Sequence, residues 1–293
     1  MRTVFLGTSE FAAIILRRLA ASPHRPELVV TRPDRPRGRG RKLAAPPVAS
    51  LARELRIELD QPESVNDEAA QRRIADAQPE VVLVCAFGAL IKEPLLSRYP
   101  MRNVHPSLLP RWRGAAPIER AIMAGDEQTG VSIMQLTAGL DSGPVCAQRS
   151  EPIGPQDTYG SLADRLAGIG GELLVSTLEQ RPPCREQDEA LATYAEKIAS
   201  EDRELDAGRS ALELERVVRA LSPHIGAFIL LDDGTRLGVR QARVSAGPAQ
   251  PGIRLAPPLP ALGTSDGTLE LLVVQPPGGR PMSGEDYLRG RQT

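Results

Sequence analysis

One segment of the chain, NVHPSLLPRWRGAAP at residues 103–117, holds an Asn, one of only three His and the only Trp between prolines. If residues 101–105 form a strand, Asn103 and His105 point to the same face, because strand side chains alternate. Pro106 would end that strand, since proline has no N–H for the ladder. An amide and an imidazole would then project together, ready to stabilise an oxyanion or take a proton. An isolated Asn-x-His is more often a surface histidine beside a turn.

A second polar group lies in the loop GLDSGPV at residues 139–145. Asp141 follows one glycine and precedes another, and glycines permit close backbone approach and unusual dihedral angles. A carboxylate in such a loop can orient an imidazole and favour its charged form. Asp is also a common turn residue. Neither segment alone identifies a function.

The elements that must position these groups are short apolar runs that alternate with helix-period segments. The predicted strands are 3–7, 27–31, 80–88 and 130–136, and the predicted helices are 11–22, 46–57 and 157–179. This alternation predicts a mostly parallel sheet with helices on its faces. Ligands bind at the carboxyl edge of such sheets. We therefore expect Asn103 and His105 at the ligand-binding edge.

The composition changes in the last third of the chain. Residues 184–203 are polar and mixed in charge, as in an extended linker. Beyond them a helical pattern at 210–223 precedes short strand-like pieces, and Asp233-Gly234 is a strong hairpin signal. These pieces predict a small, OB-like β-barrel. The predicted domains are an α/β domain at 1–183, a linker at 184–203 and a β-barrel domain at 204–293.

The net charge, the lengths of the apolar runs and the cysteines limit the classes of protein to which the chain can belong. A net charge of -1 means that nucleic-acid binding would need a local basic patch. No run approaches the roughly 20 apolar residues of a membrane span, and the N-terminus lacks a signal-peptide pattern, so we expect a cytoplasmic protein with no membrane partner. Cys85, Cys146 and Cys184 are isolated. They indicate neither a metal site nor a disulfide framework, and we expect reduced thiols and no metal.

Taken together, NVHPSLLPRWRGAAPIERAI and TGVSIMQLTAGLDSGPV resemble the two signature segments of folate-dependent formyltransferases. The resemblance implies a Rossmann-like catalytic domain that moves a formyl group from 10-formyltetrahydrofolate to an amine. It assigns catalysis to Asn103, His105 and Asp141. The Asn103 amide would stabilise the tetrahedral oxyanion, and His105 would donate to the same oxygen or take the amine's proton. Asp141 would orient His105.

The resemblance also places the folate between AFGALI at 86–91 and SLLP at 107–110, whose apolar side chains suit a pterin. Core packing is the alternative for the side chain of Phe87. LGTSEF at 6–11 lacks the Gly-x-Gly-x-x-Gly of a dinucleotide site, which disfavours a dehydrogenase. The implied folate-binding residues are Phe87, Gly88, Leu90, Ser107, Leu108, Leu109 and Pro110.

A basic segment, TRPDRPRGRGRKLAAPPV at 31–48, resembles the loop with which one branch of the family grips the acceptor end of initiator tRNA. Gly38 and Gly40 would let this loop order on a bound strand. A solvated run of charge is the alternative. The C-terminal ending LELLVVQPPGGRPMSGEDYLRGR resembles the same branch, in which the barrel domain assists tRNA binding. The implied tRNA-binding residues are Arg35, Arg37, Arg39, Arg41 and Lys42.

Three hypotheses follow. The first is a monomeric enzyme that formylates the α-amino group of methionyl-initiator-tRNA for translation initiation, and it rests on the basic loop, the Asn-His-Asp set and the second domain. The second is a nucleotide-sugar N-formyltransferase, which uses the same folate donor but has no use for a basic loop. The third is a non-catalytic RNA-binding protein, against which the intact Asn-His-Asp set argues. We rank them in this order.

Overall fold

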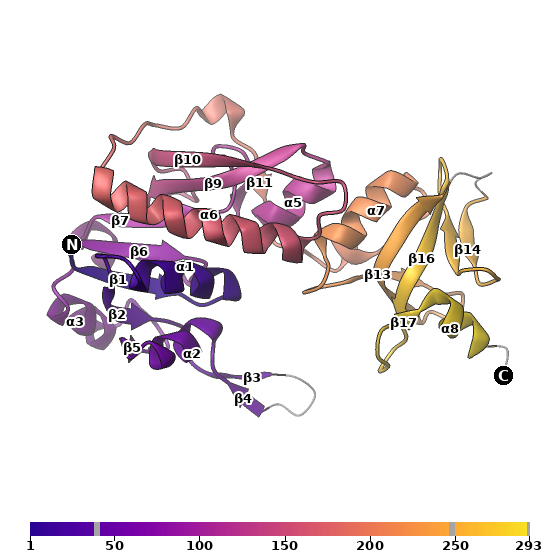
Figure 1. Ribbon diagram of the computed structural model, residues 1–293, viewed down its shortest axis with the longest axis horizontal. Helices are drawn as coiled ribbons and strands as arrows, with labels where there is room; N and C mark the ends of the chain where they lie inside the picture. Colours follow the sequence, from indigo (N-terminus) through magenta and orange to yellow (C-terminus); the bar gives the residue numbers. More distant parts are fainter. Residues whose placement is uncertain (38–41, 246–249, 292–293) are drawn as a thin grey trace. The chain divides into compact units, whose positions relative to one another are not determined.

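The computed structural model describes residues 1–37, 42–245 and 250–291 (Figure 1). The chain divides into two units, each built from segments that are not consecutive in sequence. This division differs from the predicted consecutive domains, and the predicted boundaries stay a prediction. Unit 1 comprises Met1–Gly114, Thr129–Glu151 and Ala163–Tyr194, and unit 2 comprises Ala115–Gln128, Pro152–Leu162 and Ala195–Thr293.

Unit 1 is built on a seven-stranded sheet with the order β10-β9-β7-β6-β1-β2-β5. Its strands are β1 (Thr3–Gly7), β2 (Pro26–Val30), β5 (Glu58–Asp60), β6 (Val81–Cys85), β7 (Met101–His105), β9 (Gln128–Gln135) and β10 (Val145–Pro152). The first five of these pair in parallel, and β9 runs antiparallel to β7. β1 and β6 are buried along their whole length, which explains their unbroken apolar runs. The predicted mostly parallel α/β sheet is confirmed.

The packing of helix α6 explains why two adjacent glycines occur inside a long helical pattern. A Cβ on Gly170 would lie 3.1 Å from Val104 of β7, and one on Gly171 would lie 2.9 Å from Arg18 of α1. The two glycines therefore let α6 pack closely on its neighbours in unit 1. The helices described up to residue 191 are α1 (Glu10–Ala20), α2 (Pro47–Glu54), α3 (Glu68–Asp76), α4 (Leu95–Arg98), α5 (Pro117–Ala124) and α6 (Tyr159–Gln180), with the 3₁₀ helix η1 (Glu189–Leu191). Of these, α5 belongs to unit 2.

Unit 2 contains a curled antiparallel half-barrel with the strand order β12-β13-β16-β15-β14, in which β17 also pairs with β16 (Figure 1). Gly234, at φ +76°, lies in the turn between β12 and β13, where the predicted hairpin stands. The half-barrel confirms the predicted small β-barrel fold. Its elements are η2 (Glu201–Arg203), α7 (Ala211–Ala220), β12 (Ala227–Leu230), β13 (Arg236–Ser245), β14 (Gly252–Arg254), β15 (Ala261–Gly263), β16 (Thr268–Gln275), β17 (Met282–Ser283) and α8 (Gly284–Arg289).

The predicted basic loop contains a two-stranded antiparallel ribbon. β3 (Arg35–Arg37) pairs with β4 (Lys42–Ala44), with Pro36 opposite Leu43. Two short strands thus lie inside the segment 31–48 that the sequence predicted as a loop. Two of its predicted tRNA-binding residues, Arg39 and Arg41, lie outside the described residues.

The oxidation state of two of the cysteines differs from the prediction. A disulfide joins Cys146, in β10, to Cys184, beyond the end of α6. The expectation of reduced thiols was therefore wrong for these two residues, because the fold brings together cysteines that are 38 residues apart. Cys85 is free and buried in β6, and burial raises the pKa of its thiol.

None of the described helices is both long and apolar enough to cross a membrane. Within the same described ranges, no group of three or more His, Cys, Asp and Glu residues is arranged so that it could hold a metal ion. Two short strands complete the elements, β8 (Arg113–Gly114) and β11 (Tyr194–Ala195).

Candidate functional site

The structure brings Asn103, His105 and Asp141 together at the carboxyl end of β7. Asn103 and His105 are buried, at 8% and 4% exposure, and both face the loop that follows β9. Nδ2 of Asn103 lies 3.4 Å from Oδ1 of Asp141. Nδ1 of His105 lies 3.6 Å from Oδ2 of the same carboxylate. One carboxylate therefore contacts both the amide and the imidazole.

The main chain of a second segment holds the Asp141 carboxylate. The amide of Gly114, in β8, donates a hydrogen bond to Oδ2 at 2.9 Å. Gly114 has φ +120°, which favours glycine over any residue with a side chain. Asp141 has φ +45°, a left-handed conformation that an Asp adopts more readily than most residues. Among the residues that the structure describes, this carboxylate accepts one hydrogen bond from a side chain and one from a backbone amide.

The second ring nitrogen of His105 contacts a backbone carbonyl. Nε2 lies 2.8 Å from the carbonyl oxygen of Trp112, and a carbonyl only accepts, so Nε2 carries the proton. Trp112 has φ +63°, an unusual conformation for a bulky residue. The imidazole is thus held by Trp112 at one nitrogen and faces Asp141 with the other.

The segment that follows His105 is braced by one hydroxyl on β9. Oγ of Ser132 accepts from the amide of Leu109 at 3.1 Å and donates to the carbonyl of Ser107 at 2.6 Å. Nε2 of Gln148 donates to the same hydroxyl at 2.9 Å and to the Leu109 carbonyl at 2.8 Å. These contacts fix the main chain that leads from His105 toward Trp112.

The predicted folate-binding residues differ in their access to solvent. The side chain of Phe87 is buried and belongs to the core of unit 1. Ser107 is fully buried, and its hydroxyl donates to the carbonyl of Arg111 at 2.6 Å. Leu109 is also buried. The remaining four are partly or fully exposed, namely Gly88, Leu90, Leu108 and Pro110.

Three of the predicted tRNA-binding residues, Arg35, Arg37 and Lys42, lie in the strands of the β3–β4 ribbon. Arg35 is 62% exposed and lies 4.0 Å from Glu63, and Lys42 is exposed. The side chain of Arg37 lies outside the described part of the chain, as do Arg39 and Arg41.

The sequence analysis did not identify three side chains near the site, those of Arg113, Gln187 and Glu189. Arg113 is 1% exposed, and its guanidinium donates to both carboxylate oxygens of Glu189 at 2.9 and 2.7 Å. These bonds raise the pKa of Arg113 and lower that of Glu189. Nε of Arg113 donates to Oε1 of Gln187 at 3.0 Å, although the two residues are 74 positions apart. No local pattern in the sequence signals either contact.

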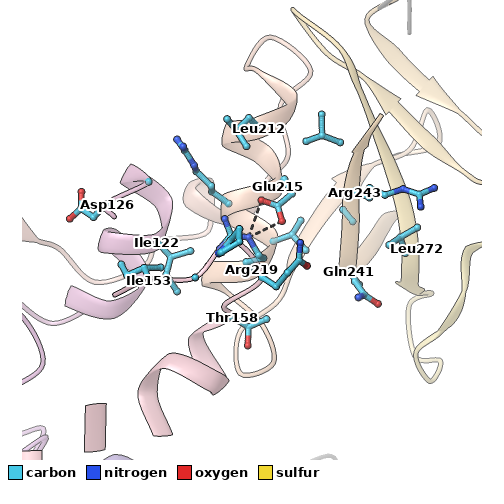
Figure 2. A pocket seen from close by; sticks show the side chains of 18 of the residues that line it. Ile122, Asp126, Ile153, Thr158, Leu212, Glu215, Arg219, Gln241, Arg243 and Leu272 are labelled. Carbon is cyan, nitrogen blue, oxygen red and sulfur yellow. Dashed lines mark hydrogen bonds and ion pairs between the residues drawn. The ribbon is translucent and has the colours of Figure 1, made fainter. Parts of the chain in front are cut away.

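A separate cavity of about 580 Å³ lies within unit 2 (Figure 2). Arg219 of α7 bonds Glu215 at 2.7 and 2.9 Å and the carbonyl of Asp157 at 2.8 Å. The guanidinium of Arg216 lies over Gly125, where a Cβ would be 2.2 Å from it. Four arginines line the cavity, namely Arg216, Arg219, Arg240 and Arg243.

Comparison with known proteins relates both parts of the chain to one family. Residues 1–178 match the family described as formyl transferase, and residues 197–292 match the family described as formyl transferase, C-terminal domain. A methionyl-tRNA formyltransferase of Methylococcus capsulatus is 45% identical over 297 residues, which cover 98% of this chain and 96% of the relative.

Two solved structures share the fold at low sequence identity. HypX from Aquifex aeolicus in complex with tetrahydrofolic acid is 17% identical with a TM-score of 0.66, and the match covers 98% of this chain and 47% of HypX. An N-formyltransferase from Helicobacter canadensis in complex with folinic acid and dTDP-3-aminofucose is 14% identical with a TM-score of 0.68. That match covers 91% of this chain and 97% of the other.

Proposed function

This chain belongs to the formyl transferase family, and from this premise we propose that it transfers the formyl group of 10-formyltetrahydrofolate to the α-amino group of methionyl-initiator-tRNA. Relatives that are 42–45% identical over nearly the whole chain are named methionyl-tRNA formyltransferase, which supports this acceptor over a nucleotide sugar. The product, N-formylmethionyl-tRNA, serves translation initiation. The third hypothesis, RNA binding without catalysis, is disfavoured by the same relatives.

The contact of Asn103 and His105 with Asp141 is the observation that carries the proposal. The amine attacks the formyl carbon, a C–N bond forms, and the carbonyl oxygen becomes a tetrahedral oxyanion. Asn103 has two amide hydrogens, of which one faces Asp141 and the other remains for the oxyanion. Such a donor contributes about 3 kcal/mol in other oxyanion holes. Collapse of the oxyanion then breaks the bond to the folate nitrogen.

His105 and Asp141 act together as the proton acceptor. An α-amino group has a pKa near about 8, so a useful fraction is already neutral and a strong base is unnecessary. Nε2 of His105 is engaged by Trp112, which leaves Nδ1, 3.6 Å from the Asp141 carboxylate, to share the amine's proton with it. The same pair returns a proton to the departing folate nitrogen.

We propose that the folate lies between residues 86–91 and 107–110, with Gly88, Leu90 and Leu108 as the accessible contacts. These three are at least partly exposed, whereas Phe87 and Ser107 are buried and support the walls from within. An apolar slot with backbone polar groups suits a pterin and its attached ring.

We propose that the basic β3–β4 ribbon binds the tRNA and that the C-terminal part of the chain assists this binding. Arg35, Arg37, Arg39, Arg41 and Lys42 would contact phosphates of the acceptor stem. In unit 2, the arginine-lined cavity offers further guanidinium groups to a phosphate backbone (Figure 2). Because all three catalytic groups belong to one unit of one chain, a monomer suffices. We also propose that the enzyme works in the cytoplasm.

The test is transfer of labelled formyl from 10-formyltetrahydrofolate to charged initiator methionyl-tRNA. Charged elongator methionyl-tRNA and a panel of amino-sugar nucleotides serve as alternative acceptors. We expect product on the initiator tRNA alone. Product on a sugar nucleotide alone, or tRNA binding with no product at all, would reject the proposal.

A further inference from the structure

Residues 184–194, called the strap below, lie against the catalytic loops of unit 1. Arg185 and Val145 exchange two backbone hydrogen bonds at 2.8 and 2.9 Å. At the other end of the strap, the amide of Trp112 donates to Oγ1 of Thr193 at 2.9 Å. The strap is therefore tied at one end to the strand after the Asp141 loop and at the other to the residue that holds His105.

Gln187, in the middle of the strap, contacts the Asp141 loop directly. Its Nε2 donates to the carbonyl oxygen of Asp141 at 2.8 Å and to that of Gly143 at 2.7 Å. Its Oε1 accepts from Nε of Arg113 at 3.0 Å. Turning the amide over would set an oxygen against two carbonyl oxygens and an NH₂ against a guanidinium, so only one orientation satisfies these partners.

The loop needs such a contact because apolar burial does not hold it. Residues 138–140 are exposed, and the side chain of Leu140 is 63% exposed. Asp141 itself has φ +45°, a left-handed conformation that residues with a side chain adopt less readily than the right-handed one. Hydrogen bonds to the carbonyls on either side of Ser142 set two peptide planes and, through them, the direction of the Asp141 side chain.

Arg113 connects this contact to the carboxylate. Its guanidinium fixes Gln187, and the next residue, Gly114, donates its amide to the carboxylate of Asp141. Glu189 neutralises the charge of the buried guanidinium. The two residues of β8 thus hold Asp141 in two ways. Arg113 acts on its main chain through Gln187, and Gly114 bonds its side chain.

We infer that Gln187 is a positioning residue for formyl transfer, which keeps the Asp141 carboxylate against Asn103 and His105. The inference rests on the proposed function and deepens the description of its site. Gln187 acts through the main chain of the Asp141 loop and touches neither substrate.

Gln187→Met tests the inference, because it keeps the length of the side chain and removes its hydrogen bonds. Gln180→Met is the matched control, since Gln180 is exposed at the end of α6 and bonds the Ser176 side chain. We expect Gln187→Met to lower kcat about tenfold or more and to leave both KM values within about threefold. Gln180→Met keeps the wild-type values. A raised KM with unchanged kcat would assign Gln187 to substrate binding and overturn the inference.

A double-mutant cycle separates positioning from general support of the fold. In an Asp141→Ala background, adding Gln187→Met should cost no further activity, because the group that it positions is already gone. A further decrease as large as that in the wild-type background would show that Gln187 acts elsewhere. If Gln187→Met does not fold, Gln187→Glu replaces it, since Glu keeps an acceptor for Arg113 and lacks the donors.

A measurement without substrates keeps this inference distinct from the proposed function. The chain has only three histidines, so the ring resonances of His105 are assignable by comparison with His24 and His224 variants. We expect these resonances to shift in Gln187→Met and to stay in place in Gln180→Met. Unshifted resonances would overturn the inference. Absence of formyl transfer by the wild-type chain would reject the proposed function and leave this measurement intact.

Discussion

The Nε2–H of His105 donates a hydrogen bond to the carbonyl oxygen of Trp112 at 2.8 Å. The only tryptophan of the chain therefore serves the site through its main chain, in a left-handed conformation at φ +63°. With Nε2 engaged, the nitrogen that faces Asp141 is Nδ1. This bond sets both the tautomer of the imidazole and the plane of its ring.

Asn103→Ala should lower turnover about 100-fold, as expected when one oxyanion donor is removed, with little change in tRNA affinity. Asn103 is buried at the end of β7, and its amide bonds Asp141 rather than any residue of the basic ribbon that the structure describes. Single-turnover kinetics and tRNA titrations measure the two effects, and thermal unfolding checks the fold. An unchanged rate would remove Asn103 from the mechanism.

Arg39→Ala should weaken tRNA binding and flatten its salt dependence, because removing one cation–phosphate interaction lowers the slope of log K against log salt by about 0.9. The measurement is a series of tRNA titrations at increasing salt. Arg72→Ala is the control, since Arg72 is exposed on α3 and lies 3.7 Å from Glu68. A slope identical to that of the wild type would make the basic segment a solvated run of charge.

Reduction of the Cys146–Cys184 disulfide should lower the free energy of unfolding by about 4 kcal/mol, because the bond closes a loop of 38 residues in the unfolded chain. Urea unfolding with and without dithiothreitol measures this difference. The double variant Cys146→Ser with Cys184→Ser should not respond to the reductant. Equal midpoints for the oxidised and reduced wild type would contradict the prediction.

Protonation of His24 should destabilise the fold as the pH falls. Burial lowers the pKa of His24 from its ordinary 6.5, and neither ring nitrogen has a hydrogen-bond partner among the described residues. The unfolded state therefore binds this proton more readily, so stability is full above about pH 6.5 and is lost as the pH falls toward the folded pKa.

Urea unfolding at about pH 7.5 and pH 5.5 tests this pH dependence. His24→Leu should lose less stability than the wild type between these two values, because the variant has no group to titrate at this position. Equal losses in the two proteins would show that other groups carry the pH dependence.

Local patterns predicted the central strands of the sheet and helices α1, α2 and α6, whereas β5, β10, α3 and α5 were not predicted. The strands at 3–7 and 101–105 agree with β1 and β7, and the helical segment at 157–179 agrees with α6 within two residues at its start. Proline, chain alternation and helical periodicity act over a few residues, so the sequence carries them directly. The linker at 184–203 was predicted from its polarity alone. Polarity did not reveal that both the oxygen and the nitrogen of the Gln187 side-chain amide make hydrogen bonds within the fold.

By itself, the sequence determined that Asn103 and His105 share a face at the end of a strand, because alternation with period two is a local property. It also determined the apolar strands of the parallel sheet. Only the tertiary structure decided that Asp141 reaches both residues, that Cys146 pairs with Cys184, and that Arg113 bonds Gln187, which bonds the Asp141 loop. The disulfide joins residues 38 positions apart, and the Arg113–Gln187 bond joins residues 74 positions apart. Which distant segments become neighbours depends on how the sheet and helices pack, and no local pattern carries that information.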